Sequence, residues 1–171
     1  MSFLALPSET YKESYLQALL EFQAEGRNLT IDVRRLDEGF GGFVQFLREQ
    51  TDRSKIAPGR VPSSDFWLID DNEYIGRLSV RHELNDQLLK VGGHIGYEIR
   101  PSKRRLGYGN QILQLGLQKA KELGLRRVLV TCDEDNIGSK KIIENNGGQF
   151  ENAIEIDESN VKKLRYWIDI P

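Results

Sequence analysis

The stretch IRPSKRRLGYGN, residues 99–110, decides the fold of this 171-residue chain. An apolar run with the pattern of a strand ends at Pro101. Three cations follow, Lys103, Arg104 and Arg105, and two glycines then lead into a helical pattern. Glycine lacks the Cβ that would hold an anion away from the backbone. The first amides of a helix have no internal acceptors and carry the positive end of the helix dipole. The stretch therefore predicts a loop that binds the phosphates of a polyanionic ligand.

The residues on both sides place this loop inside a β-α-β unit. Apolar and small residues recur from Gly109 to Leu123 at the spacing of one helical face, and Gly124 is suited to end the helix. Residues 126–132 then form a short run rich in branched side chains, as expected for a buried central strand. Ligands of such units bind at the carboxyl ends of the strands, so we expect the loop to lie at an opening of the sheet.

The rest of the chain supplies further strands and helices around this unit. Strands are expected at residues 3–6, 66–69, 74–82, 93–100, 150–156 and 164–170, and helices around residues 11–22, 40–50 and 136–146. Residues 28–35 are ambiguous, and residues 51–64 have the composition of a loop. Strands before and after one central β-α-β unit predict a mixed sheet with helices packed on it, in a single domain of residues 1–171.

Composition excludes several classes of protein. A chain with 39% hydrophobic and 29% charged residues is an ordinary globular protein, and no run approaches the length needed to cross a bilayer. The formal net charge of −2 gives no general attraction to nucleic acid. The amino terminus lacks the features of a signal peptide, and the single Cys132 cannot form an internal disulfide. These features predict a cytoplasmic protein without a nucleic-acid partner, a membrane partner or a metal site.

The loop and its flanks resemble the GNAT superfamily of N-acetyltransferases. The pyrophosphate loop of that family reads Gln or Arg, two residues, Gly, one residue, and Gly or Ala, and residues 104–109 match it completely with RRLGYG. The resemblance extends over residues 93–101 before the loop and 131–139 after it, about half of the chain. It implies an α/β fold with a mixed, mostly antiparallel sheet, a central β-α-β unit and helices on both faces. It also implies that two parallel strands splay apart and admit the pantetheine arm of acetyl-CoA.

The resemblance also implies which residues bind the cofactor. Backbone groups around Glu98, Ile99 and Arg100 would hold the pantetheine arm, and the amides of residues 105–110 would hold the pyrophosphate. The full set of implied cofactor-binding residues is Ile99, Arg100, Arg104, Arg105, Leu106, Gly107, Tyr108, Gly109, Asn110, Asn136 and Ser139. The Arg104 guanidinium either adds charge to the loop or fastens it to its neighbours. Asn136 matches an asparagine that the family often uses for the cofactor arm, although Asn136 and Ser139 are equally suited to cap a helix.

Glu98 is the first candidate for a general base, because an amine attacks a thioester only when it is unprotonated. Strand alternation places Glu98 on one face with His94 and Arg100, and some family members carry a catalytic glutamate on this strand. The alternative is a carboxylate paired with Arg100 or another strand cation. His94 is the second candidate, although a lone histidine on a strand is commonly structural.

The family's usual acid is missing from this sequence. Many relatives place a tyrosine seven residues after the asparagine, and that position is Ile143 here. Ser139, a water molecule or unassisted departure of the thiolate all stay open, since a thiol is acidic enough to leave as an anion. Cys132 could be imagined as an acyl carrier, but a buried structural thiol explains it as well.

The sequence therefore predicts an N-acetyltransferase that passes an acetyl group from acetyl-CoA directly to a primary amine, with no metal. A non-catalytic acyl-CoA-binding or sensor domain is the alternative, supported by the missing tyrosine. A dinucleotide-binding enzyme is disfavoured because Ile112 stands where that fingerprint has its third glycine. The acceptor, a small-molecule or peptide amine, is not identified, and residues 28–64 are expected to shape its pocket. The oligomeric state is open, with a homodimer among the options.

Overall fold

The computed structural model describes all residues, 1–171, and contains one seven-stranded sheet. The strands are β1 (Phe3–Ala5), β2 (Ser63–Asp70), β3 (Glu73–Arg81), β4 (Ile95–Ile99), β5 (Arg127–Asp133), β6 (Gln149–Ile154) and β7 (Lys163–Asp169). Their order across the sheet is β1-β2-β3-β4-β5-β7-β6. Only β4 and β5 are parallel neighbours, and every other pair is antiparallel. The predicted mixed, mostly antiparallel sheet is confirmed.

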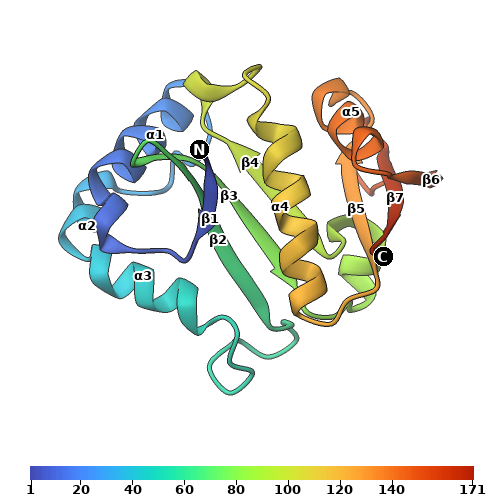
Figure 1. Cartoon of the computed structure of the whole chain (residues 1–171), viewed down its shortest axis with the longest axis horizontal. Coiled ribbons are helices and arrows are strands. Elements are labelled where there is room, and N and C mark those ends of the chain that lie inside the picture. The colour runs from blue at the N-terminus through green and yellow to red at the C-terminus, as the bar shows by residue number, and fades with distance from the viewer.

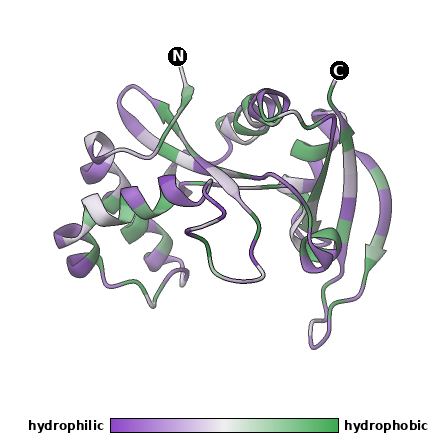
Figure 2. Cartoon of the chain, turned by 90° about the horizontal axis from the view of Figure 1, so that it is seen from below, coloured by the Kyte–Doolittle hydropathy of each residue, from purple (hydrophilic) through white to green (hydrophobic).

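Helices cover both faces of this sheet (Figure 1). They are α1 (Lys12–Ala24), α2 (Val33–Glu38), α3 (Phe40–Glu49), α4 (Tyr108–Glu122) and α5 (Ile137–Asn145), with the short turns η1 (Glu9–Tyr11), η2 (Leu88–Gly92) and η3 (Pro101–Lys103). Figure 2 shows α4, seen nearly end-on, on one side of the sheet and the amino-terminal helices on the other. None of the helices is long and apolar enough to cross a membrane.

Two hydrophobic cores fix these helices in place. The larger core has 17 buried residues, including Leu78 on β3, Ile112 on α4 and Ile143 on α5. The smaller core lies under α1 and α3 and is rich in aromatic rings, with Tyr15 stacked on Trp67 at 4.8 Å between ring centroids. Because each core packs its helices on one face of the sheet, α4 lies against β3 and β4 on one face and α1 lies against β3 on the other.

The amino-terminal half departs from the predicted elements in a few places. The ambiguous segment 28–35 contains the start of α2, and β2 begins at Ser63, inside the predicted loop. α3 forms although its first turn contains Gly41 and Gly42, and ordering glycine in a helix has a high conformational cost. Burial of Phe40 and Val44 in the smaller core offsets that cost.

Candidate active site

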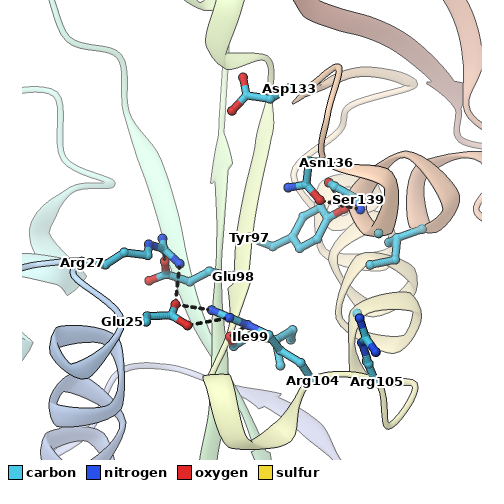
Figure 3. Close-up of a pocket in the computed structure, with 13 residues that line it drawn as sticks. Glu25, Arg27, Tyr97, Glu98, Ile99, Arg104, Arg105, Asp133, Asn136 and Ser139 are labelled. Atoms are coloured by element: carbon cyan, nitrogen blue, oxygen red, sulfur yellow. Dashed lines mark hydrogen bonds and ion pairs between the residues drawn. The ribbon is translucent and has the colours of Figure 1, made fainter. Parts of the chain in front are cut away.

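β4 and β5 are joined at one end and separate at the other. The only paired position is Ile95 with Val130, and His94 N donates to the Leu129 carbonyl at 2.7 Å beside it. Toward their carboxyl ends the two strands make no further pairs, as the splay implied by the family predicts. A cleft of about 720 Å³ opens there (Figure 3). It is lined by Glu25, Arg27, Tyr97, Glu98, Ile99, Arg104, Arg105, Gly109, Asp133, Asn136, Gly138, Ser139 and Ile142.

The backbone of β4 presents polar groups to this cleft. Arg81 N donates to the His94 carbonyl at 2.7 Å, and Arg100 N donates to the Ile75 carbonyl at 2.8 Å. Since backbone groups alternate in direction along a strand, the even-numbered residues face β3. The backbone groups of Tyr97 and Ile99 therefore face the cleft. This corrects the expectation for the amide of Arg100, which is already bonded to β3.

The loop before α4 presents three open amides. α4 begins at Tyr108, and its N-cap, Gly107, has φ +88° and no side-chain cap. The amides of Tyr108, Gly109 and Asn110 donate to no acceptor in the chain. These are the orphan donors of a helix start, at the positive end of its dipole. Because Gly109 lines the cleft, the amides can hold an anion that lies in it.

The two glycines of the loop are required for different reasons. At Gly107 a Cβ would meet nothing within 4 Å, so only the positive φ favours glycine there. At Gly109 a Cβ would lie 2.4 Å from Cδ1 of Ile142 on α5. Gly107 thus shapes the turn, whereas Gly109 lets α5 approach the start of α4.

Arg104 and Arg105 have different surroundings. The Arg104 guanidinium donates two bonds to Glu25, at 2.8 and 2.7 Å, and its Nε donates to the Ile99 carbonyl at 3.2 Å. Bonding to Arg104 lowers the pKa of the Glu25 carboxyl. Arg104 therefore fastens the loop to α1, which was one of its two predicted roles. Arg105 lines the cleft without an ion pair, so its charge is available to a ligand.

Several predicted cofactor residues point their side chains elsewhere. Arg100 pairs with Glu21 on α1 at 2.7 Å, and the Tyr108 hydroxyl donates to Asp70 at 2.8 Å. The side chain of Leu106 is exposed, and that of Asn110 accepts from Asn145 at 3.4 Å. None of these four residues lines the cleft. Apart from the amides of Tyr108 and Asn110, they support the loop rather than contact the cleft.

Tyr97 and Ser139 form a hydroxyl pair in the cleft. Their oxygens lie 2.8 Å apart, and the Asn136 side chain accepts from Ser139 N at 3.0 Å, so Asn136 caps α5. Burial raises the pKa of Tyr97 to about 12, which keeps its hydroxyl protonated. Ile143, at the position where many relatives have the tyrosine, is fully buried in the larger core. Sequence reasoning missed Tyr97, because nothing local marks a residue paired with one 42 positions away.

Glu98 lines the cleft and is held by two arginines from different elements. Arg77 Nε donates to one carboxylate oxygen at 2.7 Å, and Arg27 donates to the other at 2.8 Å. The predicted alternative, a pair with Arg100 or another strand cation, is present in its second form: Arg77 lies on β3, whereas Arg100 is bonded to Glu21. A carboxylate offers about four lone-pair sites, so Glu98 keeps acceptor capacity toward the cleft.

His94 lies outside the cleft, at the joined end of β4 and β5. Its side chain is buried, and its Nδ1 accepts from Leu129 N at 2.9 Å. Burial, with a smaller contribution from Arg81, lowers the pKa of His94. This placement favours the structural interpretation of His94 over a catalytic one.

We expect the free energy of unfolding to fall less steeply with decreasing pH in His94→Gln than in the unchanged protein. The unfolded chain binds a proton at its ordinary pKa of about 6.5, which the buried ring resists. The stability that depends on a neutral His94 is thus present above about pH 6.5 and is lost as pH falls toward the lower folded pKa. Urea unfolding at a series of pH values measures the slope. An identical slope in the variant would contradict this account of His94.

The Cys132 thiol is poorly suited to carry an acyl group. Burial raises the pKa of the Cys132 thiol to about 11, which disfavours the thiolate that an acyl carrier needs. No group of three or more His, Cys, Asp or Glu side chains is arranged to hold a metal ion.

No residue of the segment 28–64 lines the cleft, although Asn28 lines a small adjoining hollow with Glu98. That this segment shapes the acceptor pocket stays a prediction.

Comparison with known proteins places the chain in a family. A family model described as acetyltransferase (GNAT) domain matches residues 45–149. No curated protein sequence gives a significant match. Among solved structures, the ribosomal L7/L12 alpha-N-protein acetyltransferase RimL in complex with coenzyme A has a TM-score of 0.71 and 18% identity, covering 99% of this chain and 94% of that one.

Two further structures share this fold. Mycobacterium smegmatis RimJ in complex with CoA-disulfide has a TM-score of 0.72 and 19% identity, covering 98% of this chain and 81% of that one. The microcin C7 self immunity acetyltransferase MccE, in complex with acetyl-CoA and AMP, has a TM-score of 0.72 and 14% identity, covering 99% and 92%. At these identities the structures show a common fold, and the family model spans more than half of the chain. The chain belongs to the GNAT family of acetyltransferases.

Proposed function

We propose that the cleft between β4 and β5 binds acetyl-CoA and that the protein passes the acetyl group directly to a primary amine. The observation that carries this proposal is the set of open amides at Tyr108, Gly109 and Asn110, beside the place where the strands separate. Backbone donors at a helix start suit a diphosphate, and an unpaired strand edge suits an extended arm with amide groups.

The proposed acetyl-CoA site has two parts, one for the pyrophosphate and one for the pantetheine arm. The amides of residues 108–110 would take the pyrophosphate, with Arg105 adding a charge. The backbone of Tyr97 and Ile99 would bond the pantetheine arm, and the Asn136 side chain keeps its NH₂ group free for the same arm. Gly107 and Arg104 act indirectly, by shaping the turn and by holding it to α1.

Glu98 is the proposed general base. The acceptor nitrogen attacks the thioester carbonyl carbon, its proton passes to Glu98 directly or through water, and the C–S bond breaks to release the thiolate. Alkylamines have a pKa near that of lysine, about 10.4, so most of the acceptor carries an extra proton at neutral pH. A carboxylate in the cleft favours approach of that cation and can then accept its proton.

The Tyr97 and Ser139 hydroxyls are the proposed source of a hydrogen bond to the departing thiolate. They form a connected pair in the cleft, and the high pKa of Tyr97 keeps its hydroxyl protonated. When one hydroxyl of the pair donates to the other, the proton of the second is free for the thiolate. This proposal supplies a partner for the thiolate where the tyrosine of many relatives is replaced by the buried Ile143.

We expect Tyr97→Phe to lower kcat by about fivefold, because a neutral hydrogen bond contributes about 1 kcal/mol. Since the pKa of Tyr97 is about 12, the loss should be equal at neutral and mildly alkaline pH. Stopped-flow detection of free coenzyme A measures kcat. Tyr166→Phe is the matched control, because that hydroxyl also has a raised pKa and donates to Glu144 outside the cleft. An unchanged kcat in Tyr97→Phe would remove the pair from the mechanism.

The experiment that tests the function is thioester turnover. Purified protein is mixed with acetyl-CoA and a panel of primary amines, and release of free thiol is followed together with the acetylated product by mass spectrometry. Transfer to at least one amine supports the enzyme. Tight acetyl-CoA binding with no transfer to any amine would favour the alternative, a domain that holds acyl-CoA without using it.

We further propose that residues 1–171 act as one domain in the cytoplasm, on a small-molecule or peptide amine. The net charge of −2 argues against nucleic acid as a partner. Light scattering at several concentrations tests the homodimer, and limited proteolysis tests the single domain.

A further inference from the structure

Glu98 is flanked by two arginines that remain open to solvent. The Glu98 side chain is 16% exposed, whereas Arg77 is 53% exposed and Arg27 is 47% exposed. Figure 3 shows Arg27 reaching the carboxylate from the α1 side of the cleft. Arg77 donates only its Nε–H to Glu98, so its terminal N–H groups have no partner in the chain. These groups exceed what is needed to hold one carboxylate.

Positive charge continues along the same face of β3. Arg81 has no carboxylate within ion-pair distance, and its Nη1 donates to the carbonyls of Gly92 at 3.0 Å and Gly93 at 3.3 Å. Asp65 is the carboxyl close enough to affect it, and Arg60 and Arg77 add like charge nearby. Burial raises the pKa of Asp65, while Arg77, Arg81 and Arg60 act in the opposite direction, so three guanidinium groups lie around this one carboxyl. This face therefore carries an excess of guanidinium groups, although the protein as a whole is slightly acidic.

The charged face is separate from the proposed phosphate site. Alternation along β4 turns Tyr97 toward Ser139 on α5 and Glu98 toward Arg27 after α1. The open amides of α4 lie on the α5 side, since Gly109 contacts Ile142. Acetyl-CoA bound to those amides would therefore leave the region around Glu98, Arg27 and Arg77 open to the acceptor amine.

We propose that the acceptor amine carries an anionic group, a carboxylate or a phosphate, that binds the Arg77 guanidinium, with Arg27 and Arg81 adding positive potential. This inference rests on the proposed acetyl transfer and narrows its acceptor class. Guanidinium binds both oxyanions through paired N–H groups, and the exposed end of Arg77 supplies such a pair. Glu98 accepts only from the Nε–H of Arg77, so the terminal N–H groups of Arg77 stay available to an anion. The same Glu98 carboxylate can then accept the proton of the amine that lies beside it.

The test compares matched acceptors that differ in one anionic group. The small-molecule arm uses 4-aminobutyrate against 4-aminobutanamide and phosphoethanolamine against ethanolamine. The peptide arm uses amidated Ser-Asp-Ala-Ala against Ser-Asn-Ala-Ala. We expect kcat/KM to be at least about tenfold higher for the anionic member of a pair, and the arm that shows it identifies the source of the anion. Transfer without preference in every pair overturns this inference alone, whereas no transfer to any amine overturns the proposed function with it.

Variants of Arg77 assign the preference to this residue. Arg77→Gln should lower the ratio of kcat/KM between anionic and neutral acceptors by about tenfold, and Arg77→Lys should retain part of it. Arg34→Gln is the control, because Arg34 is 89% exposed and pairs only with Glu38 on α2. Melting temperature and acetyl-CoA affinity confirm that each variant is folded. If Arg77→Gln lowers both members of a pair equally, the residue acts only through Glu98 and the proposal is wrong.

Discussion

Replacing Gly107 with valine is expected to weaken coenzyme A binding by about 10- to 100-fold. Gly107 has φ +88°, where a side chain costs about 1–2 kcal/mol and a branched one more. The variant loop should leave this conformation and turn the amides of Tyr108 and Gly109 out of line. Each charge-assisted bond to a phosphate contributes about 1.5–3 kcal/mol, so the loss of one such bond accounts for the expected range. Isothermal titration calorimetry with coenzyme A measures it.

Gly124 provides a matched control at the other end of α4. It has φ +86°, and a Cβ there would also meet nothing within 4 Å. Gly124→Val should therefore lower the melting temperature about as much as Gly107→Val does, without changing the affinity for coenzyme A. Equal affinities in the two variants would mean that the turn at Gly107 has no part in binding.

Replacing Glu98 with glutamine should lower kcat at neutral pH by about 100-fold, the usual contribution of a general base. Glutamine keeps the shape of the side chain but has little basicity. The dissociation constant for acetyl-CoA should stay nearly unchanged, because the proposed donor contacts come from the backbone of Tyr97 and Ile99 and from α4. The deficit should narrow at alkaline pH as the free amine becomes abundant.

The control for Glu98 is Glu151→Gln on β6. Glu151 also accepts from an arginine, Arg165, and from Trp167 at 3.0 Å, but it lies outside the cleft. Its replacement removes a paired carboxylate without touching the proposed chemistry. A rate that is unaltered in Glu98→Gln would exclude Glu98 as the base. A rate that falls only for anionic acceptors would indicate that Glu98 serves merely to orient Arg77.

The central β-α-β unit was predictable because its signals are local. The positive φ at Gly107, the apolar face of α4 and the branched residues of β5 each depend on residues that are close together in the chain. Local patterns also gave the faces of β4 correctly, since alternation turns Glu98 and Tyr97 to opposite sides. The family resemblance added the splay of β4 and β5, which no periodicity predicts.

The partners of the site residues were not predictable, because they come from distant parts of the chain. Glu98 is 71 positions from Arg27, and Arg104 is 79 positions from Glu25. Alternation indicates the face on which a side chain lies, but the packing of α1 on the smaller core decides which residue meets it there. For the same reason Arg100, one of the predicted partners of Glu98, is instead bonded to Glu21 on α1.

The most direct test of the account follows the amide of Gly109 by nuclear magnetic resonance in protein labelled with ¹⁵N-glycine. Coenzyme A should shift this signal strongly, and pantetheine, which lacks the pyrophosphate, should shift it far less, while Gly124 serves as an internal reference. Coenzyme A that binds without moving the signal of Gly109 would contradict the claim that the start of α4 holds the diphosphate.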